Sequence, residues 1–173
     1  MHDVVMQSLQ PNHSLPAGRD WLALAGSLLV VFVAAAIGGF GTRSAPEFYA
    51  QLSLASWAPP AWLFGPAWTV LYTMMGVAAW LVWRAPGRHG VAIGLFGAQL
   101  VPNMLWGWFF FAWRQGGLAS ADIVVLDVLV VMTLIAFWRV RPLAGMLLVP
   151  YLAWISFATA LSFSTWQRNP GLL

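Results

Sequence analysis

The stretch from Ser56 to Tyr72 reads SWAPPAWLFGPAWTVLY, and it decides how the rest of the chain is understood. The Pro59-Pro60 pair lacks amide donors and favours extended backbone, so the first half of the stretch cannot continue a helix. From Pro66 the pattern becomes helical, and Trp68 and Tyr72 fall on one face at i, i+4. Non-helical backbone at membrane depth persists only where it is buried in protein or lines a cavity. We therefore interpret this stretch as the lid and one wall of a pocket.

The composition places this pocket in a membrane. The chain of 173 residues is 61% hydrophobic and 8% charged, with a mean hydropathy of +0.77. A helix needs roughly 20 apolar residues to cross the hydrocarbon core. The sequence predicts an all-α integral membrane protein: one five-helix transmembrane bundle over residues 19–169, with a long loop between helices one and two. The expected helices cover residues 21–42, 64–83, 90–113, 118–138 and 142–167, and residues 1–18 are expected to form a disordered tail.

The charged residues indicate topology rather than a binding partner. All 8 basic residues are arginines, spread over short connections, so the basic patch that nucleic-acid binding requires is missing. Counting five spans, five arginines fall on the N-terminal side and three on the other, which predicts a cytoplasmic N-terminus. We expect a bacterial membrane. The chain has no cysteine, and His2, His13 and His89 do not form a metal-ligand spacing, so we expect no metal and no required cofactor.

The third expected helix has two distinct faces. One carries small residues at every fourth position, a spacing that lets two helix backbones approach closely and predicts a homodimer seam. The other carries Gln99, Asn103 and Trp106, about 100° away at 3.6 residues per turn. One helix could therefore serve a dimer seam and a pocket at once. The predicted seam consists of Gly90, Gly94 and Ala98.

The fourth expected helix contains two acidic residues. Ser120 is a suitable N-cap, and Asp122 in the first turn is explained by the helix dipole. Asp127 lies deeper, and an ionisable group there needs a partner or a functional reason. Five residues separate the two carboxylates, so they do not share a face and do not predict an acid–base dyad.

Three deep tryptophans point to one pocket. Trp68, Trp106 and Trp154 each share a helical face with a polar or aromatic neighbour, whereas most other tryptophans lie near span ends, where an aromatic belt explains them. A deep aromatic residue is more often a packing residue than a ligand contact. The convergence nevertheless fits an apolar pocket with a few placed polar groups. The neighbours are Tyr72, Asn103 and Tyr151.

Three motifs in order along the chain carry a family resemblance. WAPPAWLFGPAWTVLY, GAQLVPNMLWGWFFF and PYLAWISFATALSFSTW resemble the TspO/MBR family, the tryptophan-rich sensory proteins of bacteria and the mitochondrial translocator proteins. The resemblance implies a five-helix membrane fold, usually dimeric, that binds porphyrins, sterols and benzodiazepine-like ligands. By motif, its pocket residues fall on Tyr49, Trp57, Trp68, Asn103, Trp106, Trp154 and Ala158, to which the helical faces add Gln99 and Tyr151.

The chain departs from the family pattern near the end of the fifth helix. Phe163 stands where the sterol motif of animal members has a tyrosine, and Ser162 stands where asparagine is frequent. Arg43, Tyr49 and Leu52 satisfy the reversed sterol motif, a weak pattern. Sterol binding is therefore not expected as the native role.

Three functions are open at this point. We expect a membrane protein that binds porphyrins or other tetrapyrroles and acts as a sensor or exchanger, without enzyme activity. The first alternative is light- and oxygen-dependent porphyrin breakdown, for which the resemblance implicates Trp68 and Trp154. The second alternative is a small-molecule transporter, coupled to protons through Asp127.

Overall fold

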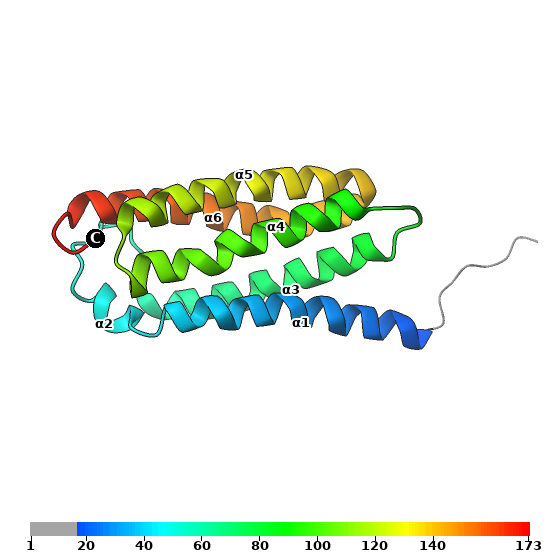
Figure 1. The fold of residues 1–173 in the computed structure, drawn as a ribbon, viewed down its shortest axis with the longest axis horizontal. Coiled ribbons are helices and arrows are strands. Elements are labelled where there is room, and N and C mark those ends of the chain that lie inside the picture. Colours follow the sequence, from blue (N-terminus) through cyan, green and yellow to red (C-terminus); the bar gives the residue numbers. More distant parts are fainter. Residues whose placement is uncertain (1–16) are drawn as a thin grey trace, which may run out of the picture.

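The computed structural model describes residues 17–173, and it is all-helical over that range (Figure 1). Residues 1–16, which make up most of the predicted tail, lie outside the described residues. A 3₁₀ turn, Ala61–Leu63, leads into α3, and a π-helical turn, Trp108–Ala112, follows α4. The α-helices in the described range are α1 (Ala17–Gly41), α2 (Ala45–Tyr49), α3 (Phe64–Trp83), α4 (Gly90–Gly107), α5 (Gly116–Val140) and α6 (Pro142–Arg168).

The five long helices close into a ring. Helix α1 packs against α3 and α4, α3 packs against α6, and α5 packs against both α4 and α6. All five run along the long axis of the molecule, and α2, the π-helical turn and the C-terminus lie together at one end (Figure 1). The ring therefore encloses an interior that α1, α3, α4 and α6 can all line.

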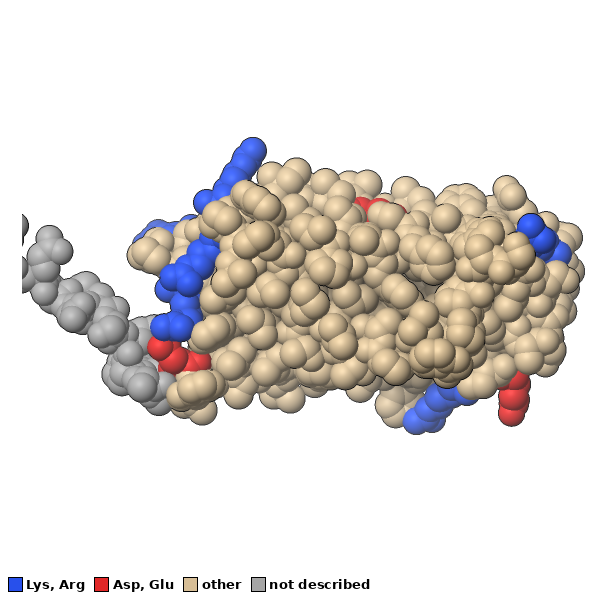
Figure 2. Space-filling model, turned by 180° about the vertical axis from the view of Figure 1, so that it is seen from behind, with Lys and Arg blue, Asp and Glu red and all other residues tan. Residues whose placement is uncertain are grey.

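Four helical segments in the described range are long and apolar enough to cross a membrane: Asp20–Gly41, Ala61–Trp83, Gly116–Val140 and Pro142–Arg168. On the face that Figure 2 shows, arginine side chains gather towards the two ends, and the middle is almost free of charge. This pattern confirms an all-helical integral membrane protein in a lipid bilayer. Helix α4 is outside this group, so length and composition alone do not establish the fifth span.

Several predicted boundaries differ from the structure. Helix α1 begins at Ala17, so the last two residues of the predicted tail are helical. Helix α5 begins at Gly116, and Ser120 is a buried residue inside it rather than its N-cap. The long connection after α1 is only partly irregular, because α2 lies within it and ends at Tyr49. The third helix stops being an α-helix at Gly107 and widens into the π-helical turn.

Glycines bring α1 very close to its neighbours. A Cβ atom added at Gly41 would lie 2.8 Å from the backbone nitrogen of Trp108, in the π-helical turn. One added at Gly76 of α3 would lie 2.7 Å from Leu28 Cδ2. The Gly41 contact is with backbone and requires a residue without a side chain, so it fixes how α1 packs against the π-helical turn, whereas the Gly76 contact brings α3 close to a leucine side chain of α1. At the other end of α1, Arg84 forms a 2.9 Å ion pair with Asp20.

The carboxylate of Asp127 in α5 accepts hydrogen bonds from the neighbouring helix. The Ser156 and Thr159 hydroxyls of α6 donate to the two oxygens of Asp127, at 3.1 and 2.6 Å. The partner that the sequence required is therefore a pair of hydroxyls on the neighbouring helix.

Candidate functional site

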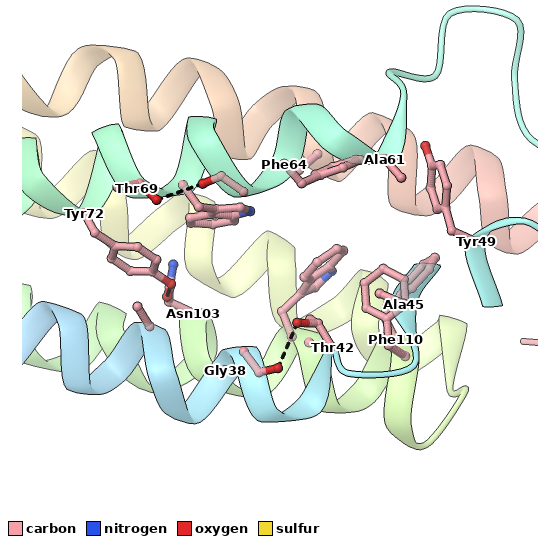
Figure 3. Close-up of a pocket in the computed structure, with 18 of the residues that line it drawn as sticks. Gly38, Thr42, Ala45, Tyr49, Ala61, Phe64, Thr69, Tyr72, Asn103 and Phe110 are labelled. Atoms are coloured by element: carbon pink, nitrogen blue, oxygen red, sulfur yellow. Dashed lines mark hydrogen bonds between the residues drawn. The ribbon is translucent and has the colours of Figure 1, made fainter. Parts of the chain in front are cut away.

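A cavity of about 560 Å³ lies inside the ring of helices, towards the end that carries α2 (Figure 3). Residues of α1, α2, α3, α4, the π-helical turn and α6 line it. Its volume falls within the range of about 300–1,000 Å³ that is typical of small-molecule sites. No charged side chain of the described residues lines it. No group of three or more His, Asp or Glu within residues 17–173 could hold a metal ion.

Two stacked aromatic pairs form parts of the cavity wall. Trp68 stacks on Tyr72, with ring centroids 5.3 Å apart and planes 27° apart. Trp106 stacks on Phe110, at 5.4 Å and 24°. The first pair follows from i, i+4 spacing on α3, and the second spans the junction between α4 and the π-helical turn. That turn also brings the adjacent residue Phe111 onto the same lining. The cavity therefore offers flat aromatic surfaces to a ligand.

A buried chain of hydrogen bonds closes the inner end of the cavity. Tyr72 Oη donates to Asn103 Oδ1 at 2.6 Å, and Asn103 Nδ2 donates to Tyr151 Oη at 2.8 Å. Tyr151 Oη then donates to Gln99 Oε1 at 2.9 Å. Tyr72 and Asn103 line the cavity, whereas Tyr151 and Gln99 are behind them. The two outer members therefore meet a ligand, and the two inner members hold them in place.

The end of the cavity is covered by α2 and the loop that follows it. Tyr49, the last residue of α2, lines the cavity and donates a hydrogen bond to the Pro59 carbonyl oxygen at 3.1 Å. Its ring packs edge-on against Phe64 at 5.8 Å. Burial raises the pKa of the Tyr49 phenol above its ordinary value of 10.0. Tyr49 therefore stays protonated at neutral pH and keeps donating to Pro59.

The side of the cavity between α1 and α3 is partly exposed. Five lining residues on these two helices are exposed, although they belong to the cavity wall. The close contact at Gly76 holds α1 and α3 together farther along, beyond the inner end of the cavity. A ligand dissolved in the bilayer could therefore reach the interior through this seam. The exposed residues are Phe32, Ala36 and Gly39 of α1, and Gly65 and Thr69 of α3.

The nine predicted ligand-binding residues divide into three groups. Tyr49, Trp68, Asn103, Trp106 and Ala158 line the cavity, and Gln99 and Tyr151 lie directly behind Asn103. Trp57 and Trp154 do not line it. Trp154 lies in a separate apolar groove with residues of α3 and α6, and Phe64 stands between its ring and the cavity, with centroids 5.9 Å apart. Trp57 packs against Phe157, which lines the same groove, at 5.7 Å.

Sequence reasoning missed several parts of the site. Among them are the phenylalanines of the wall and the last lining residues of α6: Phe64, Phe110, Phe111, Leu161, Ser162 and Thr165. The sequence placed Tyr72 in the predicted pocket wall beside Trp68 but not among the ligand-binding residues, yet it lines the cavity and begins the hydrogen-bond chain. The α1 wall was not predicted at all, because its small residues offer no chemical signature. The signal that could have indicated this wall is the helical spacing of its small residues, which places Ala35, Gly38 and Gly39 on one face of α1.

Comparison with known proteins gives a consistent result. Residues 27–167 match a sequence model described as the TspO/MBR family. The human "Translocator protein" is 40% identical over 129 residues, which cover 72% of this chain and 76% of that protein. "Tryptophan-rich protein TspO" of Chlorobaculum tepidum is 39% identical over 150 residues, 82% of this chain and 94% of that protein. The "Tryptophan-rich sensory protein" of Cereibacter sphaeroides is 37% identical over 154 residues, 87% and 93%.

Proposed function

The chain belongs to the TspO/MBR family, and from this premise we propose that it binds porphyrins or related tetrapyrroles in the cavity between α1, α3, α4 and α6. In this role it acts as a membrane-embedded tetrapyrrole sensor or exchanger. Benzodiazepine-like molecules, and sterols less readily, are further ligands of the same cavity.

The observation that carries this proposal is the pair of aromatic stacks around one uncharged cavity. Trp68 and Trp106 both line the space, and each stacks on a second ring that lines it as well. Flat aromatic molecules gain both apolar burial and favourable ring geometry on such surfaces. A tetrapyrrole offers a large flat face, and its charged carboxylates find no compensating cation in the lining. We therefore expect those carboxylates to lie outside the cavity, at the end near Arg43 and Arg114.

The positions of Trp154 and Asp127 weigh against the two alternatives. Porphyrin breakdown through Trp68 and Trp154 would bring both rings to the ligand, but Trp154 is separated from the cavity by Phe64. Proton-coupled transport through Asp127 would place this carboxylate near the ligand. Asp127 is instead held by Ser156 and Thr159 and does not line the cavity. This arrangement fits ligand binding without a chemical reaction or coupled transport better than either alternative.

We further propose that α4 is a fifth span. It packs between α1 and α5, each of which is long and apolar enough to cross the bilayer, and it runs along the same axis (Figure 1). Its polar residues Gln99 and Asn103 are buried inside the ring rather than exposed to lipid. With five spans, the arginine distribution favours a cytoplasmic N-terminus.

A titration of the purified protein with protoporphyrin tests the proposal. Binding in the cavity should quench tryptophan fluorescence and shift the Soret band of the porphyrin, with saturation at one porphyrin per chain. A wild-type protein that gives neither change would contradict tetrapyrrole binding. Loss of the bound Soret band under light and oxygen, but not in the dark, would favour the degradation alternative, and porphyrin flux into liposomes would favour the transporter.

A further inference from the structure

The hydroxyl groups of the cavity wall are almost all committed to protein acceptors. Thr42, Thr69 and Thr165 each donate to a backbone carbonyl oxygen of their own helix or its end, at 3.0, 2.9 and 2.7 Å. Tyr49 and Tyr72 donate to Pro59 and Asn103. These five groups have no proton left to offer a ligand.

Two cavity-lining donors are different. Ser162 is 1% exposed, and its Oγ has no hydrogen-bond partner among residues 17–173. The indole Nε1 of Trp106 is also buried and unpartnered. A serine inside an apolar helix usually satisfies its hydroxyl with a carbonyl one turn earlier, as Thr165 does on the same helix. Leaving a buried polar group without a partner is unfavourable, and two donors of the cavity wall are in this state.

We propose that the Ser162 hydroxyl and the Trp106 indole N–H form a ligand-recognition subsite for a neutral acceptor oxygen, such as a ketone, amide or ester carbonyl. This proposal rests on the proposed function, since it assigns chemical selectivity to the same cavity. Both groups can donate, and neither carries a charge. The lining has no arginine, lysine or histidine that would balance a carboxylate, and burying an unpaired charge costs far more than burying a neutral carbonyl.

The proposed subsite predicts that Ser162→Ala changes ligand affinity but not the stability of the ligand-free protein. Removing an unpartnered buried hydroxyl does not destabilise the ligand-free protein, because no protein hydrogen bond is lost. The same change weakens the binding of a ligand that accepts a hydrogen bond there. A purely structural serine would show the opposite pattern, with lower stability and no selectivity between ligands.

The test compares two probes that differ by one carbonyl group. The tricyclic ketone 9-fluorenone and its parent hydrocarbon fluorene have the same flat shape, and both are titrated into the detergent-solubilised full-length protein. The variants are Ser162→Ala and Trp106→Phe. The matched control is Ser120→Ala, which removes another buried, unpartnered serine hydroxyl that does not line the cavity.

We expect Ser162→Ala to weaken fluorenone binding about threefold to tenfold, the range for one hydrogen bond, and to leave fluorene binding unchanged. Trp106→Phe should also reduce the preference for the ketone, and Ser120→Ala should preserve it. The infrared carbonyl stretch of bound fluorenone should move to higher wavenumber in Ser162→Ala. The thermal midpoint of the ligand-free variant should equal or exceed that of the wild type.

Equal effects of Ser162→Ala on both probes, or an unshifted carbonyl stretch, would overturn the subsite while leaving ligand binding in the cavity intact. Failure of the wild type to bind fluorenone, while it still binds protoporphyrin, would overturn the subsite alone. Failure of the wild type to bind protoporphyrin would overturn the proposed function.

Discussion

The side chain of Asn169 holds the backbone of Ser53 at both of its polar groups, across 116 positions of sequence. Asn169 Oδ1 accepts from the Ser53 amide at 2.8 Å, and Asn169 Nδ2 donates to the Ser53 carbonyl at 3.2 Å and to the Thr165 carbonyl at 2.7 Å. Asn169 is buried, so water does not readily compete for these hydrogen bonds. The loop after α2 is therefore fastened to the end of α6.

Asn169→Ala should release this loop. The change leaves three backbone groups without their partner, and we expect a loss of about 1–3 kcal/mol in the free energy of unfolding. Limited proteolysis should cut the variant within residues 50–60 faster than the wild type. Ser53→Ala is the control, because Asn169 contacts only the backbone there. Equal stability of Asn169→Ala and Ser53→Ala would show that the clamp does not hold the loop.

Trp68→Ala should weaken porphyrin binding by roughly 1–3 kcal/mol, since it removes a ring that lines the cavity. Trp154→Ala should have a smaller effect, because its ring lies behind Phe64. Tryptophan quenching and the Soret shift measure both affinities, and circular dichroism checks that the variants remain folded. If Trp154→Ala loses more affinity than Trp68→Ala, the porphyrin binds in the outer groove instead.

Gly94→Leu should convert a dimer into monomers in mild detergent. Gly90, Gly94 and Ala98 all face outward from the ring, and a Cβ atom at either glycine would meet nothing within 4 Å in the same chain. The leucine therefore leaves the protomer intact and acts only on close contact between two copies. Light scattering gives the mass, and an undiminished dimer would move the seam to another face.

Gly41→Ala should destabilise the protein by about 1–3 kcal/mol, the usual range for forced overpacking. The added methyl group would lie 2.8 Å from the Trp108 backbone nitrogen, and backbone cannot move aside as a flexible side chain can. Gly26→Ala, in the same helix but with open space around it, should be neutral or stabilising because alanine favours helix. Thermal unfolding of the two variants compares them, and equal midpoints would argue against the tight contact between α1 and the π-helical turn.

Tyr49→Phe should raise both the association and the dissociation rate of porphyrin, with a smaller change in equilibrium affinity. The variant loses the hydrogen bond to Pro59 that fastens α2 to the returning loop, and lid opening commonly limits ligand release. Replacing Pro59 and Pro60 with glycine should act in the same direction by relaxing the loop. Stopped-flow quenching measures the rates, and unaltered rates in both variants would favour entry through the α1–α3 seam.

Titration of Tyr49 should not change the association and dissociation rates of porphyrin with the wild-type protein between about pH 6 and about pH 9. Its pKa is raised above 10.0 by burial, so the phenol keeps its proton and its hydrogen bond over this range. Weakening is expected only as the pH rises above that ordinary value. A rate change near neutral pH that is retained in Tyr49→Phe would have another origin.

The sequence alone determined the features that depend on neighbours along the chain. Hydropathy and run length are local, so the long apolar helices of a membrane protein followed directly from them. The stack of Trp68 on Tyr72 followed in the same way, because i, i+4 residues on one helix meet regardless of what surrounds it. The outward face of Gly90, Gly94 and Ala98 could likewise be deduced from helical spacing, since Gln99 and Asn103 mark the inward face.

The tertiary structure decided which deep residues share one space. Trp154 and Tyr151 are close in sequence, yet Tyr151 joins the hydrogen-bond chain behind the cavity while Trp154 turns to the outer groove. That outcome depends on how α6 is rotated against α3, which is set by contacts far away in sequence. The unpartnered state of Ser162 and the clamp from Asn169 to Ser53 have the same origin. A hydrogen bond or a cavity wall forms only when separate helices reach a particular distance and rotation, and the sequence pattern of a single helix does not encode either.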